Sequence, residues 1–426
     1  MKTDTLTGAP GSRDESWGPN KDGRIFIKDV FDDGQSDARP AQGALILDDG
    51  STLIATTMME AGLPHFSIAK LNALGELDER FGRKGFLTEL FAPDLSAKAG
   101  EMVQGADGRV YMFGGSKAPD SLDTEMAVLC FDETGKRIED FGTNGQIIIE
   151  KKVNDRVFHG HLPGRIRVQA DGSLLVVANG AIGPSRVTRG YLMKFDTRGR
   201  PVTSFGNNGI VDINLPYEAV TTLKDVCVLS DGRILLAGYA HAQSASFSGG
   251  LLAMLNQNGS HNLVFGGDPK IPGFRLFAKT DRNVSLNAVT EREPGKYLAA
   301  GSIGDVGATD AIGLLLGFDN QGKNDPGFNA GAALEGAVSP SHTTGWDALF
   351  TQGANIYAAG GYDLLLASLT PDGELNPRFG TGGVVGEFMS GAANALLPYS
   401  SDRLLYVCNV IGLGGVSGVF YRYYRA

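Results

Sequence analysis

The sequence is poor in cysteine and contains no long hydrophobic run. Only 3 of its 426 residues are cysteine, and each stands alone in an apolar stretch, so we expect buried free thiols and no disulfide framework. No stretch approaches the roughly 20 apolar residues that a membrane-spanning helix needs, so no membrane-spanning segment is expected. The first residues, MKTDTLTGAPGSRDESWGP, lack the apolar core of a secretory signal peptide. We therefore expect a cytoplasmic protein, or one exported without such a signal.

Positive charge is also scarce. Lys and Arg number 38 against 48 Asp and Glu, a net charge of -10, and a negative protein is repelled by a nucleic-acid backbone. Nucleic acid is therefore not an expected partner. The residue in excess is glycine, with 60 copies, about twice the usual share of roughly 7%. This composition indicates a globular chain with many tight turns.

One pattern recurs seven times: a glycine, five residues, an aromatic residue, and then glycine or asparagine. Its first glycines are Gly11, Gly75, Gly135, Gly199, Gly259, Gly322 and Gly373. The intervals between them run from 51 to 64 residues, and the interval that joins the last to the first through the termini is 64. A wrap-around interval of normal length indicates a closed ring rather than an open solenoid.

Each repeat predicts four short strands. Two apolar runs flank a turn that is Asp-Gly in four repeats, as in RIRVQADGSLLVVANG from Arg165, and Asp-Gly between such runs is a strong hairpin signal. A third strand, the glycine-aromatic segment and a fourth strand follow, which together are typical of a propeller blade. The chain ends on a third-strand sequence, GVFYRYYRA, and begins with the missing segment and a fourth strand, GRIFIKDVF.

These observations predict an all-β fold. We expect a single seven-bladed β-propeller of four-stranded antiparallel blades over residues 11–426, after a flexible N-terminal tail of residues 1–10. The seventh blade is shared between about 390–426 and 11–31, so that an N-terminal strand closes it. A closed ring of this kind is expected to be a monomer.

The segments LDERFGRKG, EDFGTNG, TSFGNNG and LNPRFGTGG resemble the delta-60 repeat of bacterial β-propellers, a domain of unknown function. The resemblance covers nearly the whole chain. It implies the propeller fold, and it supplies no activity and no catalytic residues.

The repeated residues are expected to serve folding, because every blade has them. The aromatic residues, which we expect between neighbouring blades, are Trp17, Phe81, Phe141, Phe205, Phe265, Phe328 and Phe379. The glycines that follow, which we expect at positive φ, are Gly18, Gly82, Gly142, Gly206, Gly266 and Gly380. Four polar residues that can cap backbone N–H groups in this segment are Asp14, Asp78, Asp140 and Asn376.

Function is expected on the opposite face, where the loops differ between blades. The richest loop, residues 150–164, contains Asp155, Arg156, His159 and His161. With Arg282 and His241 from other loops, these are the predicted ligand-binding residues, placed near the central channel.

No cofactor is predicted, but a divalent metal is left open. In an extended segment His159 and His161 point to the same side, and His65, His241 or His342 could complete a metal site. A second weak candidate is the acidic loop that contains Asp32 and Asp33.

The leading functional hypothesis is a non-catalytic binding propeller that holds a carbohydrate, a peptide or a partner protein around its channel. The chain has no G-x-S-x-G, P-loop, H-E-x-x-H or C-x-x-C motif. The alternative is a hydrolase or lyase acting on a sugar or lactone, which would draw single residues from several blades and so leave no motif. Candidate carboxylates for that chemistry are Glu60, Asp94, Asp155, Glu218 and Asp305. Whether the protein is an enzyme stays open at this point.

Overall fold

The structure is a computed structural model of the 426-residue chain. It describes residues 8–31, 39–118, 124–149, 152–153, 156–182, 187–215, 220–242, 245–305, 311–336, 345–361, 363–387, 389–412 and 414–425. Of residues 152–153, 156–163 and 182 only the backbone is described.

Seven antiparallel sheets form the molecule, and each corresponds to one predicted blade. Blade 1 contains β2 (Gly43–Ile46), β3 (Thr52–Glu60), β4 (Leu63–Leu71) and β5 (Phe86–Glu89), and blade 2 contains β6 (Ser96–Lys98), β7 (Met102–Gln104), β8 (Val110–Lys117), β9 (Glu125–Phe131) and β10 (Gln146–Ile148). Blade 3 contains β11 (Lys152–Val153), β12 (Arg156–Val168), β13 (Leu174–Ile182), β14 (Thr188–Phe195) and β15 (Ile210–Ile213). Blade 4 contains β16 (Val220–Val228), β17 (Ile234–His241), β18 (Gly249–Leu255) and β19 (Phe274–Phe277).

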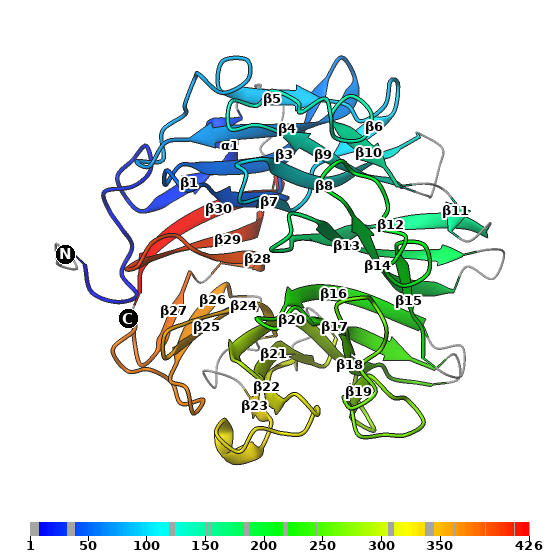
Figure 1. Ribbon diagram of the computed structural model, residues 1–426. Helices are drawn as coiled ribbons and strands as arrows, with labels where there is room; N and C mark the ends of the chain where they lie inside the picture. The colour runs from blue at the N-terminus through cyan, green and yellow to red at the C-terminus, as the bar shows by residue number, and fades with distance from the viewer. Residues whose placement is uncertain are drawn as a thin grey trace.

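Blades 5 and 6 contain β20 (Val284–Glu293), β21 (Lys296–Ile303), β22 (Ile312–Asp319) and β23 (Leu334–Gly336), and then β24 (Trp346–Gln352), β25 (Asn355–Gly360), β26 (Leu365–Leu369) and β27 (Val384–Gly386). Blade 7 contains β28 (Gly391–Pro398), β29 (Arg403–Gly412), β30 (Gly415–Tyr424) and β1 (Arg24–Phe26). Figure 1 shows the innermost strands β7, β12, β16, β20, β24 and β28 gathered around the middle of the ring. The predicted seven-bladed propeller is confirmed.

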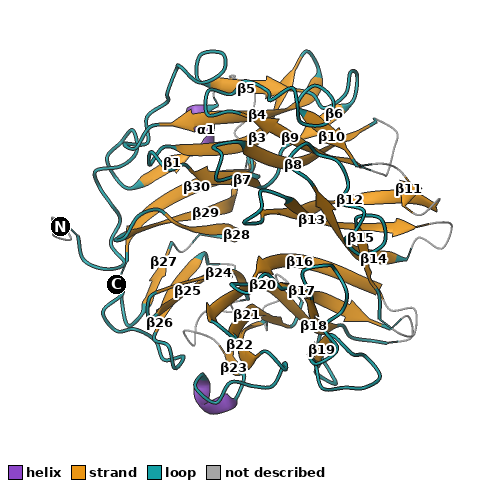
Figure 2. Cartoon of the chain, in the orientation of Figure 1, coloured by secondary structure: helices purple, strands orange, loops and turns teal. Residues whose placement is uncertain are grey.

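Two blades depart from four strands. The innermost strand of blade 2 is split into β6 and β7, which both pair with β8, and blade 3 has the short extra strand β11 beside β12. Helix is confined, among the described residues, to α1 (Ile27–Val30) and the 3-10 turn η1 (Asn329–Gly331), as Figure 2 shows. No described helix has the length and apolar character needed to cross a membrane.

The ring is closed by strands from the two ends of the chain. In blade 7, β1 pairs with β30, with Arg24 opposite Tyr421 and Phe26 opposite Val419. The N–H of Gly11 also donates to the carbonyl of Tyr424 at 2.8 Å. This is the predicted closure by an N-terminal strand. Most of the predicted tail, residues 1–7, lies outside the described residues, so its flexibility stays a prediction.

The structure buries all seven repeated aromatic rings. Their exposed fractions are 0–1%, and Phe141 shares one apolar cluster with Val128 of blade 2 and with Val176 and Met193 of blade 3. The ring of Phe141 is 5.4 Å from that of Tyr111. The repeated ring therefore fills the space between neighbouring blades, where its burial contributes roughly 1.5–3 kcal/mol.

The backbone conformation favours glycine at the position after the repeated aromatic residue. Gly142 has φ of +59°, and a Cβ there would lie 2.1 Å from the carbonyl oxygen of Gln146. In the sixth repeat Asn329 takes the position at φ of +45°, which asparagine tolerates better than most residues.

Three of the four predicted caps form. Each accepts a hydrogen bond from the backbone N–H two residues further on, and they are Asp14, Asp78 and Asn376. Asp140 instead pairs with Arg109 at 3.2 Å, because Ile138 occupies the capping position of that repeat.

All three cysteines are free. Cys130 and Cys408 are buried and Cys227 is half-buried. Burial raises the pKa of Cys227 to about 11 and that of Cys130 to about 12, so these thiols stay protonated and unreactive at neutral pH.

Candidate functional site

The innermost strands of four consecutive blades each contain a β-bulge at a corresponding place, and β20 has a second register shift between Glu291 and Glu293. The register shifts between Leu223 and Asp225 in β16, and at the corresponding places in β20, β24 and β28. A bulge leaves one residue unpaired and re-aims its side chain. The four unpaired residues are Lys224, Asn287, Asp347 and Asn394.

Every one of these residues is polar and half-buried. In the other three blades a half-buried polar residue lies in or beside the innermost strand. Gln42 directly precedes β2, Glu101 lies between β6 and β7, and Arg165 belongs to β12. We call the set of seven residues, Gln42, Glu101, Arg165, Lys224, Asn287, Asp347 and Asn394, the polar ring.

Several members of the polar ring bind the backbone of the next blade. The hydrogen bonds are Ile166 N–H to Glu101 Oε2 at 2.8 Å, Asn287 Nδ2 to the Trp346 carbonyl at 3.0 Å, and Asn394 Nδ2 to the Ala41 carbonyl at 2.7 Å. The Ala393 N–H likewise donates to Asp347. These residues hold adjacent innermost strands together as well as lining the channel.

A charged cluster lies beside the polar ring on blades 2 to 4. Arg167 donates to Asp225 at 2.8 Å and pairs with Glu101 at 2.8 Å. The second oxygen of Asp225 accepts from the Val289 N–H at 3.0 Å. Burial raises the pKa of Asp225, although the charges of Arg167 and Arg165 oppose the shift. The cluster is thus charge-balanced, with two arginines and two carboxylates.

Asp347 is in a different electrostatic position. Burial raises its pKa to about 6, against the opposing effects of Lys224, the Ala393 N–H and Arg165. Its Oδ1 accepts a hydrogen bond from Asn287 Nδ2 at 3.3 Å. No described cationic group lies within 4.0 Å of the Asp347 carboxylate, the distance limit for an ion pair. Asp347 is therefore a channel carboxyl whose pKa burial raises toward the neutral range.

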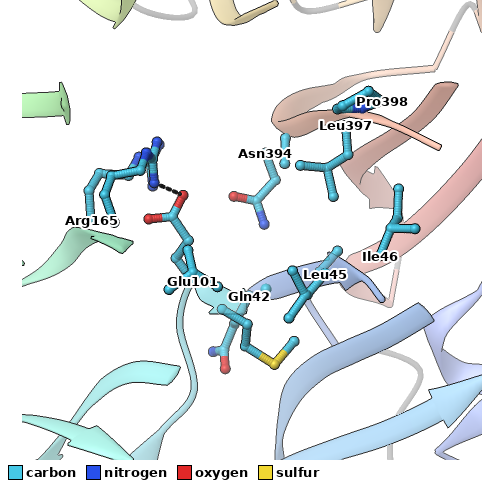
Figure 3. A pocket seen from close by; sticks show the side chains of 14 residues that line it. Gln42, Leu45, Ile46, Glu101, Arg165, Asn394, Leu397 and Pro398 are labelled. Carbon is cyan, nitrogen blue, oxygen red and sulfur yellow. Dashed lines mark ion pairs between the residues drawn. The ribbon is translucent and has the colours of Figure 1, made fainter. Parts of the chain in front are cut away.

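A cavity of about 400 Å³ opens in the channel between blades 7, 1, 2 and 3. Figure 3 shows the Glu101 carboxylate and the Asn394 amide reaching into this space, with Leu45, Ile46 and Leu397 along one side. Gln42, Arg165 and Arg167 also line it. The pocket thus has a polar side and an aliphatic side, and none of the described residues that line it is aromatic.

The structure corrects the prediction of a loop at residues 150–164. Residues 156–168 form β12, the innermost strand of blade 3, because this segment continues to pair with β13 beyond the irregularity between His161 and Arg165. His159 and His161 lie opposite Ala181 and Asn179, and like Arg156 they are described by backbone only. Asp155, Asp32 and Asp33 lie outside the described residues, so their predicted roles remain predictions.

The other predicted residues lie on separate blades. His241 ends β17 of blade 4, Arg282 precedes β20 of blade 5, and His65 on β4 of blade 1 contacts the Leu63 carbonyl at 2.8 Å. Within the described ranges no group of three or more His, Cys, Asp or Glu could hold a metal ion. Of the candidate carboxylates, Asp305 accepts from Asn283 at 2.6 Å, and Glu60 lines a second pocket together with His65.

The polar ring itself was missed at the level of sequence, although the sequence contains a signal for it. Glu101 and Arg165 each stand seven residues before the turn glycine, at Gly108 and Gly172. Gln42, Lys224 and Asn287 stand eight residues before Gly50, Gly232 and Gly295. In these five blades a polar residue at this spacing marks the channel, whereas Asp347 stands six residues before Gly353.

Residues 229–261 match the family model described as Domain of unknown function (DUF5122) beta-propeller. This match and the seven-bladed architecture fit the delta-60 resemblance of the repeats. A search of the curated proteins finds no match.

Solved structures are similar to this chain at low sequence identity. The polysaccharide lyase Uly1 matches with a TM-score of 0.55 at 10% identity, over 92% of this chain and 91% of that one. A protein of unknown function from Dyadobacter fermentans DSM 18053 gives 0.45 at 11% identity, over 95% and 100%. The alpha-l-arabinofuranosidase arb93a from Fusarium graminearum gives 0.46 at 12% identity, over 94% and 97%. At these identities the likeness concerns the fold alone.

Proposed function

We propose that this propeller, in which residues 229–261 match the DUF5122 model, is a binding protein whose channel pocket holds a carbohydrate. The observation that carries the proposal is the pocket between blades 7, 1, 2 and 3, in which polar groups from four innermost strands face one space. Its volume of about 400 Å³ falls within the range of small-molecule sites.

The chemistry of the lining suits a sugar. Asn394 and Gln42 offer amide donors and acceptors, and Glu101 offers acceptors, while Leu45, Ile46 and Leu397 provide an apolar wall. A sugar ring presents hydroxyl groups at its edge and C–H groups on its faces, so both sides of the pocket find a counterpart.

Binding is favoured over catalysis by the engagement of two carboxylates. Glu101 accepts from Arg167 and from the Ile166 N–H. Asp225 accepts from Arg167 and from the Val289 N–H. Since every oxygen of both groups already has a donor, they serve better as fixed acceptors and inter-blade contacts than as a general base.

A glycan array probed with the whole protein tests this proposal, followed by calorimetry with the glycans that bind. We expect Asn394→Leu to weaken binding about ten-fold, since an amide bound to a sugar hydroxyl contributes about 1 kcal/mol or more. The matched control is Asn207→Leu, because Asn207 is exposed in the repeated glycine-aromatic segment. Thermal melting reports whether each variant is folded. An array without any bound glycan, or equal effects of the two substitutions, contradicts the proposal.

A second candidate function, acid–base chemistry on a saccharide, is favoured by Asp347 alone. A carboxyl with a pKa of about 6 is suited to exchange protons near neutral pH. Incubation with polysaccharides, followed by assay for new chain ends, tests it. The expected result is cleavage by the wild-type protein that Asp347→Asn abolishes, and cleavage unaffected by this substitution would contradict it.

A further inference from the structure

Two cations of the polar ring have unused hydrogen-bonding capacity. Among the described residues, the carboxylate within 4.0 Å of Arg165 is that of Asp225, at 3.9 Å, and both oxygens of Asp225 already accept shorter hydrogen bonds. Lys224 lies over the ring of Tyr239 at 5.8 Å, and no described carboxylate lies within 4.0 Å of its ammonium group. Both side chains are half-buried rather than free in solvent.

These two cations lie on neighbouring blades and act on the same stretch of channel. Arg165 belongs to β12 and Lys224 to β16, which contact each other. Arg165 lines the channel pocket, and Lys224 is the residue that the bulge in β16 leaves unpaired. Donors from two adjacent blades therefore lie at corresponding places along the channel.

We propose that Arg165 and Lys224 form an anion subsite that takes the carboxylate group of an acidic saccharide, such as a uronate. This inference rests on the proposed carbohydrate-binding function and names the class of sugar. The planar guanidinium of Arg165 can donate two parallel hydrogen bonds to a carboxylate, and the ammonium of Lys224 can add a third.

Arg167 is engaged by both Glu101 and Asp225. Arg165 and Lys224 are therefore the cations of the polar ring whose donors remain for a ligand carboxylate. The channel also supplies groups for the rest of the sugar, because Arg165 lines the pocket that Asn394 and Glu101 share.

The test is calorimetry of the whole protein with oligosaccharides of galacturonic, glucuronic and mannuronic acid, each beside its methyl ester. The ester keeps the shape of the sugar and removes its charge. We expect at least one acid to bind about ten-fold or more tightly than its ester, as suits a charge-assisted pair. Arg165→Gln and Lys224→Gln are each expected to abolish this ratio while leaving affinity for the ester.

Two further variants keep the test decisive. Lys270→Gln removes an exposed lysine between the repeated segment of blade 4 and β19, and it should leave the ratio unchanged. Arg165→Lys retains the charge and should restore part of the preference that Arg165→Gln loses.

The outcomes separate the two proposals. Equal binding of acid and ester overturns the anion subsite but leaves carbohydrate binding intact. Binding of neutral glycans only has the same meaning. Tighter binding of a triglutamate peptide than of any acidic saccharide overturns the assignment of the ligand class. No binding of any saccharide, charged or neutral, overturns both proposals.

Discussion

Arg422, in the last strand of the chain, donates a hydrogen bond of 2.9 Å from Nε to the carboxylate of Asp14, which precedes it by 408 residues. The Asp14 side chain is fully buried, and that of Arg422 is 5% exposed. Arg403 of β29 also pairs with this carboxylate, at 2.5 Å. One buried carboxylate near the N-terminus therefore binds two strands of the C-terminal blade.

Asp14→Ala tests the contribution of this contact to ring closure. The substitution leaves Arg422 buried without its counter-ion, so we expect the free energy of unfolding to fall by about 3–5 kcal/mol. Urea denaturation measures it. Asp22→Ala is the control, because Asp22 forms a partly exposed pair with Arg24, and loss of such a pair costs about 1 kcal/mol or less.

The same carboxylate predicts acid sensitivity. Burial would raise the pKa of Asp14, but hydrogen bonds from Ser16 and Arg403 and the charge of Arg422 outweigh burial and lower it below 3.8. Because the unfolded chain takes up the proton at higher pH than the folded one, this stabilisation is present above about pH 4 and is lost as the pH falls through the folded pKa. We expect Asp14→Asn to flatten this part of the curve of unfolding free energy against pH. An unchanged slope below pH 4 would contradict the assignment.

The buried aromatic side chain of the repeat and an exposed residue of the same segment allow a second comparison of stability. Phe141→Ala removes a fully buried ring, and we expect it to lower the free energy of unfolding by about 3–5 kcal/mol. Leu263 belongs to the same segment of another repeat but is 72% exposed, so Leu263→Ala should change stability by about 0.5 kcal/mol or less. Similar losses from the two substitutions would show that the ring is not a structural contact between blades.

Two glycines at positive φ differ only in their surroundings. A Cβ on Gly142 would lie 2.1 Å from the Gln146 carbonyl oxygen, whereas a Cβ on Gly267 meets nothing within 4 Å. Gly267→Ala should therefore cost only the backbone strain, about 1–2 kcal/mol. Gly142→Ala should cost clearly more, because the backbone must also move. Chemical denaturation of both variants measures the difference, and equal losses would argue against the close approach.

The sequence predicted the fold because the features that build it repeat. Phe141 and its counterparts recur at fixed spacing, and the turns recur with them, so period and strand order were both evident. The channel could not be predicted in the same way. Glu101, Arg165 and Lys224 differ in charge from blade to blade, and no motif joins them.

Register was the missing information. A bulge decides whether Lys224 or Asp225 points into the channel, and a shift by one residue reverses the facing of a strand. Strand pairing fixes the bulge, and it also turned the predicted loop around His159 into part of β12. The predicted site therefore lay on that loop and at isolated histidines, and it did not include the channel-lining residues of the innermost strands.

Asp347 leads to the last prediction, in which the sign of the pH effect is opposite to that of Asp14. Burial raises the pKa of Asp347 from 3.8 to about 6, so the folded protein holds this proton more tightly than the unfolded chain does. The stabilisation is present below about pH 4 and is lost as the pH rises to about 6. The groups that face the carboxyl are Lys224, Arg165, Asn287 and the Ala393 N–H. We expect Asp347→Asn to remove the fall in unfolding free energy between these pH values and to be relatively more stable than the wild type at pH 7.

Urea denaturation of both proteins at pH 4.5 and pH 7.5 measures the effect. Parallel pH dependence of the two proteins would show that Asp347 titrates outside this range, and would remove the basis for an acid–base role of this carboxyl.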